Sequence, residues 1–366
     1  MVIGNSHKHR LAEIVLRPLG VRNPQFVPVS NLSRSHAAVP LFVSDIFAHT
    51  ELVAARVFES SERTRPNLKV QDGCDNRCSF CVIPSVRGQS RSLALEDVLS
   101  EVRTLVAVGY KELVISGINL GRWGRDLPPQ GRNAFPRFVD LLRNILNETG
   151  LEKLRISSVE PMDWIDELIS LVASSARIAK HAHVPLQAGS DSVLRRMHRK
   201  YRPWHYQEKI EKIRAAMPTA AIGADVMVGF PGETDTEFEE TRRFIEGLPL
   251  TYLHVFTFSA RPGTAAATMP DQVPHHVARE RNRILRVLGA EKKVSFMRSF
   301  LGKRVEAITL NHSAADCPDP AGGEHVFTEA LTDNYQKLLL RGHFESNRWV
   351  SARLQEIVDS AFVGAA

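Results

Sequence analysis

The chain has 366 residues, 43% of them apolar and 24% charged, which is the balance of a soluble globular protein of about two to three domains. Its net charge of +6 permits a polyanionic partner such as RNA without requiring one. No apolar run approaches the ~18 residues of a membrane span, and the first residues lack the apolar segment of a signal peptide. We therefore expect a cytoplasmic protein with no membrane attachment.

Between about residues 65 and 300, extended apolar segments alternate with amphipathic ones. The expected strands are Leu68 to Gln71, Glu112 to Ser116, Leu154 to Ser158, Ala182 to Leu186, Ile222 to Phe230 and Leu253 to Phe258. Apolar residues recur at helical spacing over 95–106 and 138–146, and the capping box Thr234 to Glu237 opens another helix. This alternation predicts an α/β fold with a parallel sheet, and six units would make a partial barrel.

Polar and glycine-rich turns follow the expected strands at residues 116–119, 157–160, 187–190, 229–233 and 259–263. The carboxyl ends of parallel strands meet at one edge of the sheet, where the chemistry of such folds gathers. The sequence therefore predicts a site at this edge.

The last 65 or so residues differ in character from the rest. Segments Arg304 to Leu310, Val326 to Thr332, Gln336 to Leu340 and Trp349 to Val358 are typical of strands separated by turn residues, and predict a small β-domain. Its basic and aromatic residues can follow a phosphate backbone and stack on a base: they include Tyr335, Lys337, Arg341, Arg348 and Trp349. An ordinary small barrel with solvated charges is the alternative.

Three cysteines lie in one loop after the first expected strand. Cys74, Cys78 and Cys81 have C-x3-C-x2-C spacing, which offers three thiolates where an iron-sulfur cubane has four corners and so leaves one iron open to another ligand. A zinc site completed by a distant residue and unpaired core thiols are the alternatives. The fourth cysteine, Cys317, has no cysteine near it in the sequence, and a chain of this length needs no disulfide framework.

Four segments together resemble the radical S-adenosylmethionine (SAM) methylthiotransferases. They are 70–75, the stretch 81–84 followed by Arg87-Gly88 and Arg91-Ser92, the run 183–191, and 228–234. The branch that modifies threonylcarbamoyladenosine in tRNA is the most similar, and the match runs from about residue 60 to the end. The resemblance implies a transferase with a partial (βα)6 radical SAM barrel over residues 60–298. Residues 299–366 would form a TRAM-like β-barrel that binds RNA.

The resemblance also implies the cofactors and their ligands. Cys74, Cys78 and Cys81 would hold a 4Fe-4S cluster, and SAM would chelate the open iron and yield a deoxyadenosyl radical, with no catalytic residue beyond the cluster. The implied SAM contacts are Phe80 against the adenine, Gly117 and Asn119 near the methionine, and Glu160, Gln187, Val228 and Gly229 facing the same cavity. The implied partners are tRNA and an electron donor such as flavodoxin or ferredoxin, and we expect a monomer.

The family pattern includes an N-terminal domain whose three cysteines bind a second 4Fe-4S cluster, which is tied to the transferred sulfur. This sequence has no cysteine before Cys74, and its residues 2–11 resemble the last strand and helix of that domain. We therefore expect residues 1–59 to be a remnant of that domain plus a linker, and sulfur insertion by this chain alone to fail. Another radical SAM activity, or an RNA-binding protein with a structural metal site, remain the alternative functions.

Overall fold

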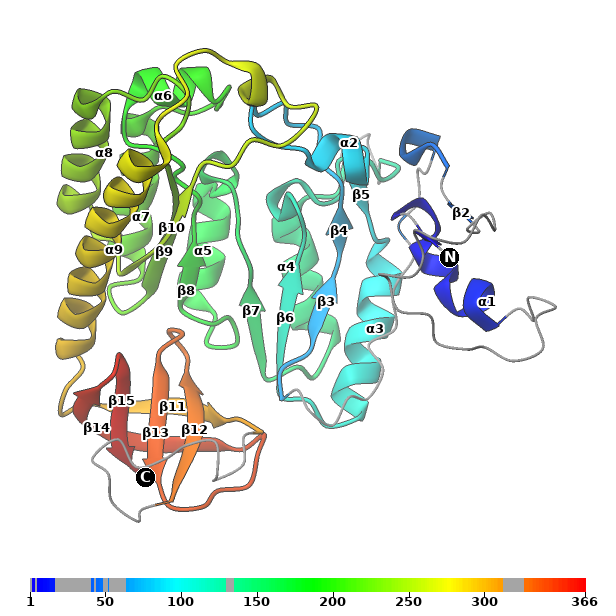
Figure 1. Cartoon of the computed structure of the whole chain (residues 1–366). Helices are drawn as coiled ribbons and strands as arrows, with labels where there is room; N and C mark the ends of the chain where they lie inside the picture. Colours follow the sequence, from blue (N-terminus) through cyan, green and yellow to red (C-terminus); the bar gives the residue numbers. More distant parts are fainter. Residues whose placement is uncertain are drawn as a thin grey trace, which may run out of the picture.

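The structure is a computed structural model that describes residues 2–3, 5–16, 41–42, 44–48, 52, 64–129, 135–311 and 326–366. An open arrangement of parallel strands occupies the centre, helices cover its outer side, and a small closed β-barrel lies at one end (Figure 1). The N-terminal segment lies at the side of the first strands (Figure 1).

Six parallel strands follow one another across the central sheet, and they confirm the predicted partial (βα)6 barrel. They are β3 (Asn67–Lys69), β6 (Glu112–Ser116), β7 (Lys153–Ile156), β8 (His181–His183), β9 (Ala221–Val228) and β10 (Tyr252–Thr257). Hydrogen bonds join them in two groups, β3-β6-β7 and β8-β9-β10. Parallel bridges from Leu154 to Ile178 and from Ser158 to His183 connect the groups, so the sheet curves as one half-barrel.

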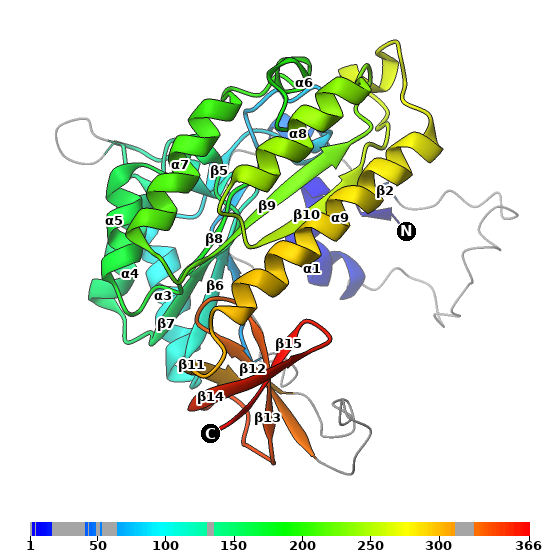
Figure 2. The ribbon, with the colours of Figure 1, turned by 90° about the vertical axis from the view of Figure 1, so that its left-hand side faces the viewer.

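The helices pack on the convex side of this sheet (Figure 2). They are α3 (Leu95–Ala107), α4 (Phe138–Glu148), α5 (Asp166–Ser174), α6 (Asp191–Arg196), α7 (Pro203–Ala216), α8 (Asp235–Gly247) and α9 (His275–Arg298). The predicted capping box is present at the start of α8, because the Glu237 amide donates to the Thr234 hydroxyl at 3.2 Å and the Thr234 amide donates to the Glu237 carboxylate at 2.9 Å. The apolar stripes of α3 and α4 are buried against the strands, as their periodicity predicts.

The first expected strand is interrupted in the structure. The chain leaves the sheet after β3, and β4 (Gln71–Asp72) pairs antiparallel with β5 (Arg91–Ser92). The short helix α2 (Ile83–Arg87) lies between β4 and β5 in the chain. The cysteine loop is therefore the connection within a two-stranded ladder, and both of its ends are fixed.

The C-terminal residues form a closed five-stranded barrel, where the sequence predicted four strands. Its strands are β11 (Arg304–Thr309), β12 (Phe327–Thr332), β13 (Lys337–Arg341), β14 (Trp349–Val358) and β15 (Ala361–Ala365), in the order β11-β12-β13-β15-β14. The unpredicted strand is β15. Asp359 and Ser360 both adopt positive φ, and this tight reversal returns the chain alongside β14.

The small barrel docks on the central domain near the start of β7. The Arg155 guanidinium donates to the Asp333 carbonyl at 3.1 Å and lies 5.3 Å from the centre of the Tyr335 ring. The Trp349 indole donates to the Glu152 carboxylate at 2.6 Å. The two aromatic residues expected to stack on RNA bases thus contact the neighbouring domain.

The three basic residues expected to follow an RNA backbone are each paired with a glutamate of the same barrel: Lys337 with Glu329, Arg341 with Glu356 and Arg348 with Glu345. All three pairs remain partly exposed, so the pairs are weak and can be exchanged for phosphate contacts.

The described N-terminal residues include two short parallel strands and a helix. These are β1 (Val2–Ile3), which pairs with β2 (Leu41–Phe42), and α1 (Leu11–Leu16). Short 3-10 turns complete the described elements: η1 (Asn5–Arg10), η3 (Ile46–Ala48), η4 (Leu120–Arg122), η5 (Pro161–Asp163) and η6 (Ala265–Thr268). Within the described ranges, no helix has the combination of length and apolar character that crossing a membrane requires.

Candidate iron-sulfur and SAM site

A buried carboxylate fixes the root of the cysteine loop. Asp72 is fully buried and pairs with Lys69 at 2.9 Å, Lys8 at 3.2 Å and Arg87 at 3.3 Å. Burial opposes its ionisation, but the hydrogen bonds and charges of Lys69 and Lys8 outweigh burial and hold the pKa of this carboxyl well below its usual range. Asp72 therefore stays ionised and joins the N-terminal segment, β4 and α2 at the base of the loop.

Gly73 makes the turn into the loop. Its φ is +72°, and a Cβ at this position would lie 1.9 Å from the Gln89 carbonyl oxygen. Only glycine avoids both the left-handed strain and this collision. The next amide, that of Cys74, donates to the Gly88 carbonyl at 3.1 Å, so the first cysteine is positioned by backbone contacts.

The tip of the loop is held by residues far away in the sequence. The Ser79 hydroxyl donates to the Arg196 carbonyl at 2.8 Å, and the Ser79 amide donates to the Met197 carbonyl at 3.1 Å. The Ser79 carbonyl accepts from the Ala266 amide at 2.8 Å. The loop is thus bound to the segments that follow β8 and β10, at the carboxyl edge of the sheet.

All three cysteines are free thiols at intermediate exposure. Cys74 Sγ faces the Asn76 amide at 3.4 Å and the Asn119 side-chain nitrogen at 3.7 Å. Cys78 Sγ accepts from the Arg199 guanidinium at 3.2 Å. Burial raises the pKa of the Cys74 and Cys81 thiols. Burial thus opposes loss of the thiol proton. Metal binding and the nearby N–H donors act in the opposite direction, because they stabilise sulfur as an anionic ligand.

The three cysteine sulfurs do not all lie within 4.8 Å of one another. Among the described residues, the group of three His, Cys, Asp or Glu ligand atoms that all lie within 4.8 Å of one another is His183, Asp225 and His254, and it contains no cysteine. Zinc with three thiolates at about 2.3 Å would bring the sulfurs to roughly 3.8 Å from one another. The three sulfurs therefore do not form a preformed zinc site, and their role as ligands of a cluster stays a prediction.

Arg199 is a site residue that the sequence analysis missed. It is buried, and besides Cys78 it contacts the Glu160 carboxylate and the Tyr201 hydroxyl, the latter at 3.2 Å. Burial raises the pKa of Glu160, against the lowering effect of the Arg199 charge. Glu160, an expected SAM contact, is therefore held beside Cys78. The run of basic residues at 195–202 is the only signal in the sequence that points to this segment.

Asn119 and Gly117, two of the expected SAM contacts, both adjoin the buried Gln71, and the Asn119 side chain also faces Cys74. The Asn119 amide donates to the Gln71 side-chain oxygen at 2.7 Å, and a Cβ on Gly117 would lie 2.9 Å from that same oxygen. Among the residues that the structure describes, the buried side-chain oxygens of Asn119 and Asn76 have no hydrogen-bond partner. Two orphaned acceptors next to Cys74 fit a ligand with an ammonium group, which the methionyl part of SAM provides.

The other expected SAM contacts lie along β9 and the segments beside it. The Phe80 ring packs edge-on against Phe230 at 6.5 Å. Gln187 has a φ of +68° and forms a bridge to Val226. The Val228 carbonyl accepts from the Phe258 amide at 2.8 Å, and the Gly229 amide donates to the Glu233 carboxylate at 2.6 Å. These backbone groups serve protein contacts, and their role toward SAM stays a prediction.

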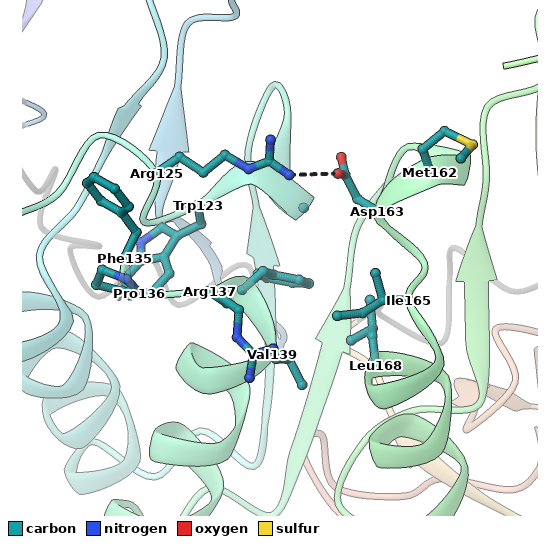
Figure 3. Close-up of a pocket in the computed structure, with 12 residues that line it drawn as sticks. Trp123, Arg125, Phe135, Pro136, Arg137, Val139, Met162, Asp163, Ile165 and Leu168 are labelled. Atoms are coloured by element: carbon teal, nitrogen blue, oxygen red, sulfur yellow. Dashed lines mark hydrogen bonds and ion pairs between the residues drawn. The ribbon is translucent and has the colours of Figure 1, made fainter. Parts of the chain in front are cut away.

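A pocket of about 500 Å³ adjoins the site and is drawn in Figure 3. Its walls are mainly apolar, with Trp123, Phe135 and Met162 on them, and Arg125 reaches Asp163 across the opening at 3.4 Å (Figure 3). Met162 and Asp163 also line a smaller cavity that contains Cys78 and Glu160. The pocket thus shares a wall with the cysteine site.

Comparisons with known proteins agree with this geometry. The family model described as Radical SAM superfamily matches residues 68–245. The threonylcarbamoyladenosine tRNA methylthiotransferase MtaB of Rickettsia prowazekii is 39% identical over 75% of this chain and 64% of its own length. MtaB of Aquifex aeolicus is 33% identical over 96% of this chain and 76% of its own length.

A relative with a different activity in its name has a similar sequence identity over a shorter part of this chain. The tRNA-2-methylthio-N(6)-dimethylallyladenosine synthase of Frankia casuarinae is 40% identical over 70% of this chain and 47% of its own length. The chain thus spans about two thirds or less of the length of several of these relatives. The cysteine loop, the strand order and the Aquifex match together show that the chain belongs to the radical SAM superfamily and, within it, to the tRNA methylthiotransferase family.

Proposed function

We propose that this chain is a radical SAM transferase that acts on tRNA, adding a methylthio group to N-threonylcarbamoyladenosine beside the anticodon. The observation that carries the proposal is the cysteine loop, with three half-buried thiols facing hydrogen-bond donors at the carboxyl edge of a partial barrel. The similarity to two MtaB proteins supports this branch of the family.

Cys74, Cys78 and Cys81 would hold a 4Fe-4S cluster. Such a cluster with SAM supplies, when bound, one-electron chemistry that removes a hydrogen atom from a carbon too inert for acid-base catalysis. The protein contributes position and charge: Asn119 and Asn76 offer acceptors beside Cys74, and Arg199 donates to Cys78. Hydrogen bonds to cluster sulfurs tune the reduction potential.

We propose three functional parts: residues 1–59 as part of an N-terminal methylthiotransferase domain plus linker, 60–298 as the radical SAM core, and 299–366 as a TRAM-like RNA-binding domain. The third part is supported by its closed barrel and by its exposed, weakly paired basic residues. Docking through Asp333 and Tyr335 would hold RNA in a fixed orientation to the core.

Further partners follow from the chemistry. A low-potential one-electron donor such as flavodoxin or ferredoxin would reduce the cluster of a cytoplasmic monomer. A second cluster is expected of the family. The sequence has four cysteines, and three of them lie in the one motif, so we propose that this polypeptide alone binds one cluster and cannot insert sulfur.

The test is made on anaerobically reconstituted protein. We expect dithionite and SAM to give 5′-deoxyadenosine, and we expect tRNA to bind with an affinity that falls with salt. Mass spectrometry of nucleosides from the treated tRNA should show no methylthio product from this chain alone. Absence of both SAM cleavage and tRNA binding would reject the proposed function, and a methylthio product would reject only the dependence on a second cluster.

A further inference from the structure

Two imidazoles and a carboxylate meet on the inner face of strands β8, β9 and β10. His183 Nε2 lies 3.1 Å from Asp225 Oδ1, and His254 Nδ1 lies 3.3 Å from the same oxygen. Burial opposes ionisation of Asp225, but hydrogen bonds from His183 and His254 outweigh it and hold the pKa of this carboxyl well below its usual range. Asp225 is therefore an anion with one oxygen engaged by both rings.

Strand alternation places these side chains inside the partial barrel. On β10, Leu253 and Val255 pack into the core, so His254 and Phe256 project to the opposite, concave face. Their exposure is high for central-domain residues: the His254 side chain is 53% exposed and Phe256 is 54% exposed. The Asp225 side chain is 25% exposed. The interior of the barrel is thus open to solvent at this group.

Hydrogen-bonding contacts with Tyr252 fix the orientation of the His183 ring. The Tyr252 hydroxyl lies 3.0 Å from His183 Nδ1 and 2.7 Å from His181 Nε2. His181 is buried, and desolvation followed by the Arg155 charge lowers its pKa well below the usual value. His181 is therefore neutral, and Tyr252 links it to His183 so that the ring nearest Asp225 is fixed in orientation.

The second oxygen of Asp225 and the outer nitrogen of His254 have no hydrogen-bond partner among the described residues. An acceptor and an imidazole nitrogen are thus presented side by side to the open interior. A ligand that carries both a hydroxyl and a carboxylate can satisfy both groups. An apolar ligand would remove water from Asp225 and His254 and would offer no hydrogen bonds in place of those that water makes. Such desolvation is unfavourable.

The relatives differ in this respect by name: MtaB proteins are named for threonylcarbamoyladenosine, and the Frankia protein for dimethylallyladenosine. The threonylcarbamoyl substituent has a hydroxyl, a carboxylate and a urea group, whereas the dimethylallyl substituent is a hydrocarbon. We propose that His254 and Asp225, with His183 fixed behind them, bind the polar substituent on N6 of the target adenosine and so select it against the hydrocarbon. The inference rests on the proposed function and names the residues that set its substrate.

Selectivity of this kind is strong because the site's own polar groups lose their partners when the wrong substrate binds. The threonyl hydroxyl would donate to Asp225, and the threonyl carboxylate would accept from the outer N–H of His254, which in the complex would carry a proton on both ring nitrogens between the two carboxylates. His254 is exposed, so its replacement tests the proposal with little risk to folding. Asp225 is more buried, and Asp225→Asn keeps its shape while removing its charge.

The experiment measures binding of three anticodon stem-loops to reconstituted protein with SAM present, by fluorescence anisotropy. One loop carries threonylcarbamoyladenosine, the second dimethylallyladenosine and the third plain adenosine. We expect His254→Ala to weaken binding of the first loop by about 10-fold to 100-fold, as for loss of a hydrogen bond to a charged group, and to leave the other two unchanged. His276→Ala, on the exposed start of α9, is the matched control and should change none.

Iron content and SAM binding should be unchanged in His254→Ala, which separates substrate recognition from damage to the cluster site. A preference for the threonylcarbamoyl loop that survives both His254→Ala and Asp225→Asn would overturn the inference alone. Equal weakening of all three loops would also overturn it. One zinc per chain, retained by the unaltered protein and lost in His254→Ala, would assign these residues to a metal instead. Failure of the unaltered protein to bind any loop would overturn the inference, and failure to cleave SAM as well would overturn the proposed function with it.

Discussion

Arg199 offers a quantitative test of the proposed cluster, because it is a buried cation that donates to Cys78 Sγ at 3.2 Å. Reduction adds negative charge to the cluster, and a nearby guanidinium stabilises that charge. Two unit charges 4 Å apart interact by about 4 kcal/mol at an effective dielectric constant of 20. If roughly a quarter of the added charge lies at the Cys78 corner, Arg199 contributes about 1 kcal/mol, or roughly 40 mV for a one-electron couple.

Replacing Arg199 alone would leave the buried Glu160 carboxylate without its cation, and an uncompensated buried charge destabilises the fold by about 3–5 kcal/mol. We therefore compare Glu160→Gln, which keeps the arginine, with the double variant Arg199→Leu/Glu160→Gln. The two proteins differ only at Arg199. We expect the cluster of the double variant to have a reduction potential lower by roughly 40 mV.

The assay is a redox titration of reconstituted protein followed by electron paramagnetic resonance, with iron content measured in parallel. Equal potentials in two variants that both retain full iron would refute the reasoning, since Arg199 would then not act on the cluster. A higher potential in the double variant would contradict the sign of the effect.

Three further outcomes are expected. Gly73→Ala should lower iron incorporation severalfold, because the added Cβ would collide with the Gln89 carbonyl oxygen. Gly109 also has a positive φ, but a Cβ there would meet nothing within 4 Å, so Gly109→Ala should retain iron. Equal iron in both variants would contradict this. Because the pKa of Asp72 is depressed in the folded protein, its ionised carboxylate stabilises the fold above the unfolded pKa of about 4, and this stabilisation is lost as pH falls through the folded pKa. Asp72→Asn should therefore flatten the acid-unfolding profile followed by circular dichroism. An unchanged profile would count against the ion cluster. Removal of residues 299–366 should weaken tRNA binding and reduce its salt dependence, at a slope of roughly 0.7 per lost phosphate contact, while SAM cleavage continues; unchanged affinity would reject the RNA-binding role.

Local sequence signals predicted the elements that depend on local physics. The capping box at Thr234 sets the start of α8, and the apolar stripe of α4 is buried as its spacing requires. The C-x3-C-x2-C spacing marked the loop in which the three half-buried thiols lie, and their role as cluster ligands stays a prediction. The six central strands were also found; the boundaries of β6 match the expected ones, and those of the other five are shifted by one to three residues.

What the sequence did not predict depends on contacts between distant residues. Arg199 reaches Cys78 across 121 positions, and Arg155 reaches the Asp333 carbonyl across 178. Nothing in either local sequence marks such a partner. The meeting of His183, Asp225 and His254 follows from the register of three strands, which is set by the packing of the whole sheet.

The fourth cysteine, which is not part of the expected site, falls outside the described residues. Cys317, which we expected to be irrelevant to the cluster, lies in the part of the chain between 311 and 326 that the structure does not describe. Its exclusion remains a prediction, and Cys317→Ala should retain iron and SAM cleavage.

The central claim is that Cys74, Cys78 and Cys81 together hold a cluster with one iron open to SAM. The most direct measurement is electron paramagnetic resonance of reduced, reconstituted protein before and after SAM is added, with metal analysis of the same samples. We predict about four irons per chain, a signal of a reduced 4Fe-4S cluster that changes when SAM binds, and loss of both iron and signal in Cys78→Ala. A colourless protein that binds zinc, or full iron in Cys78→Ala, would contradict the claim.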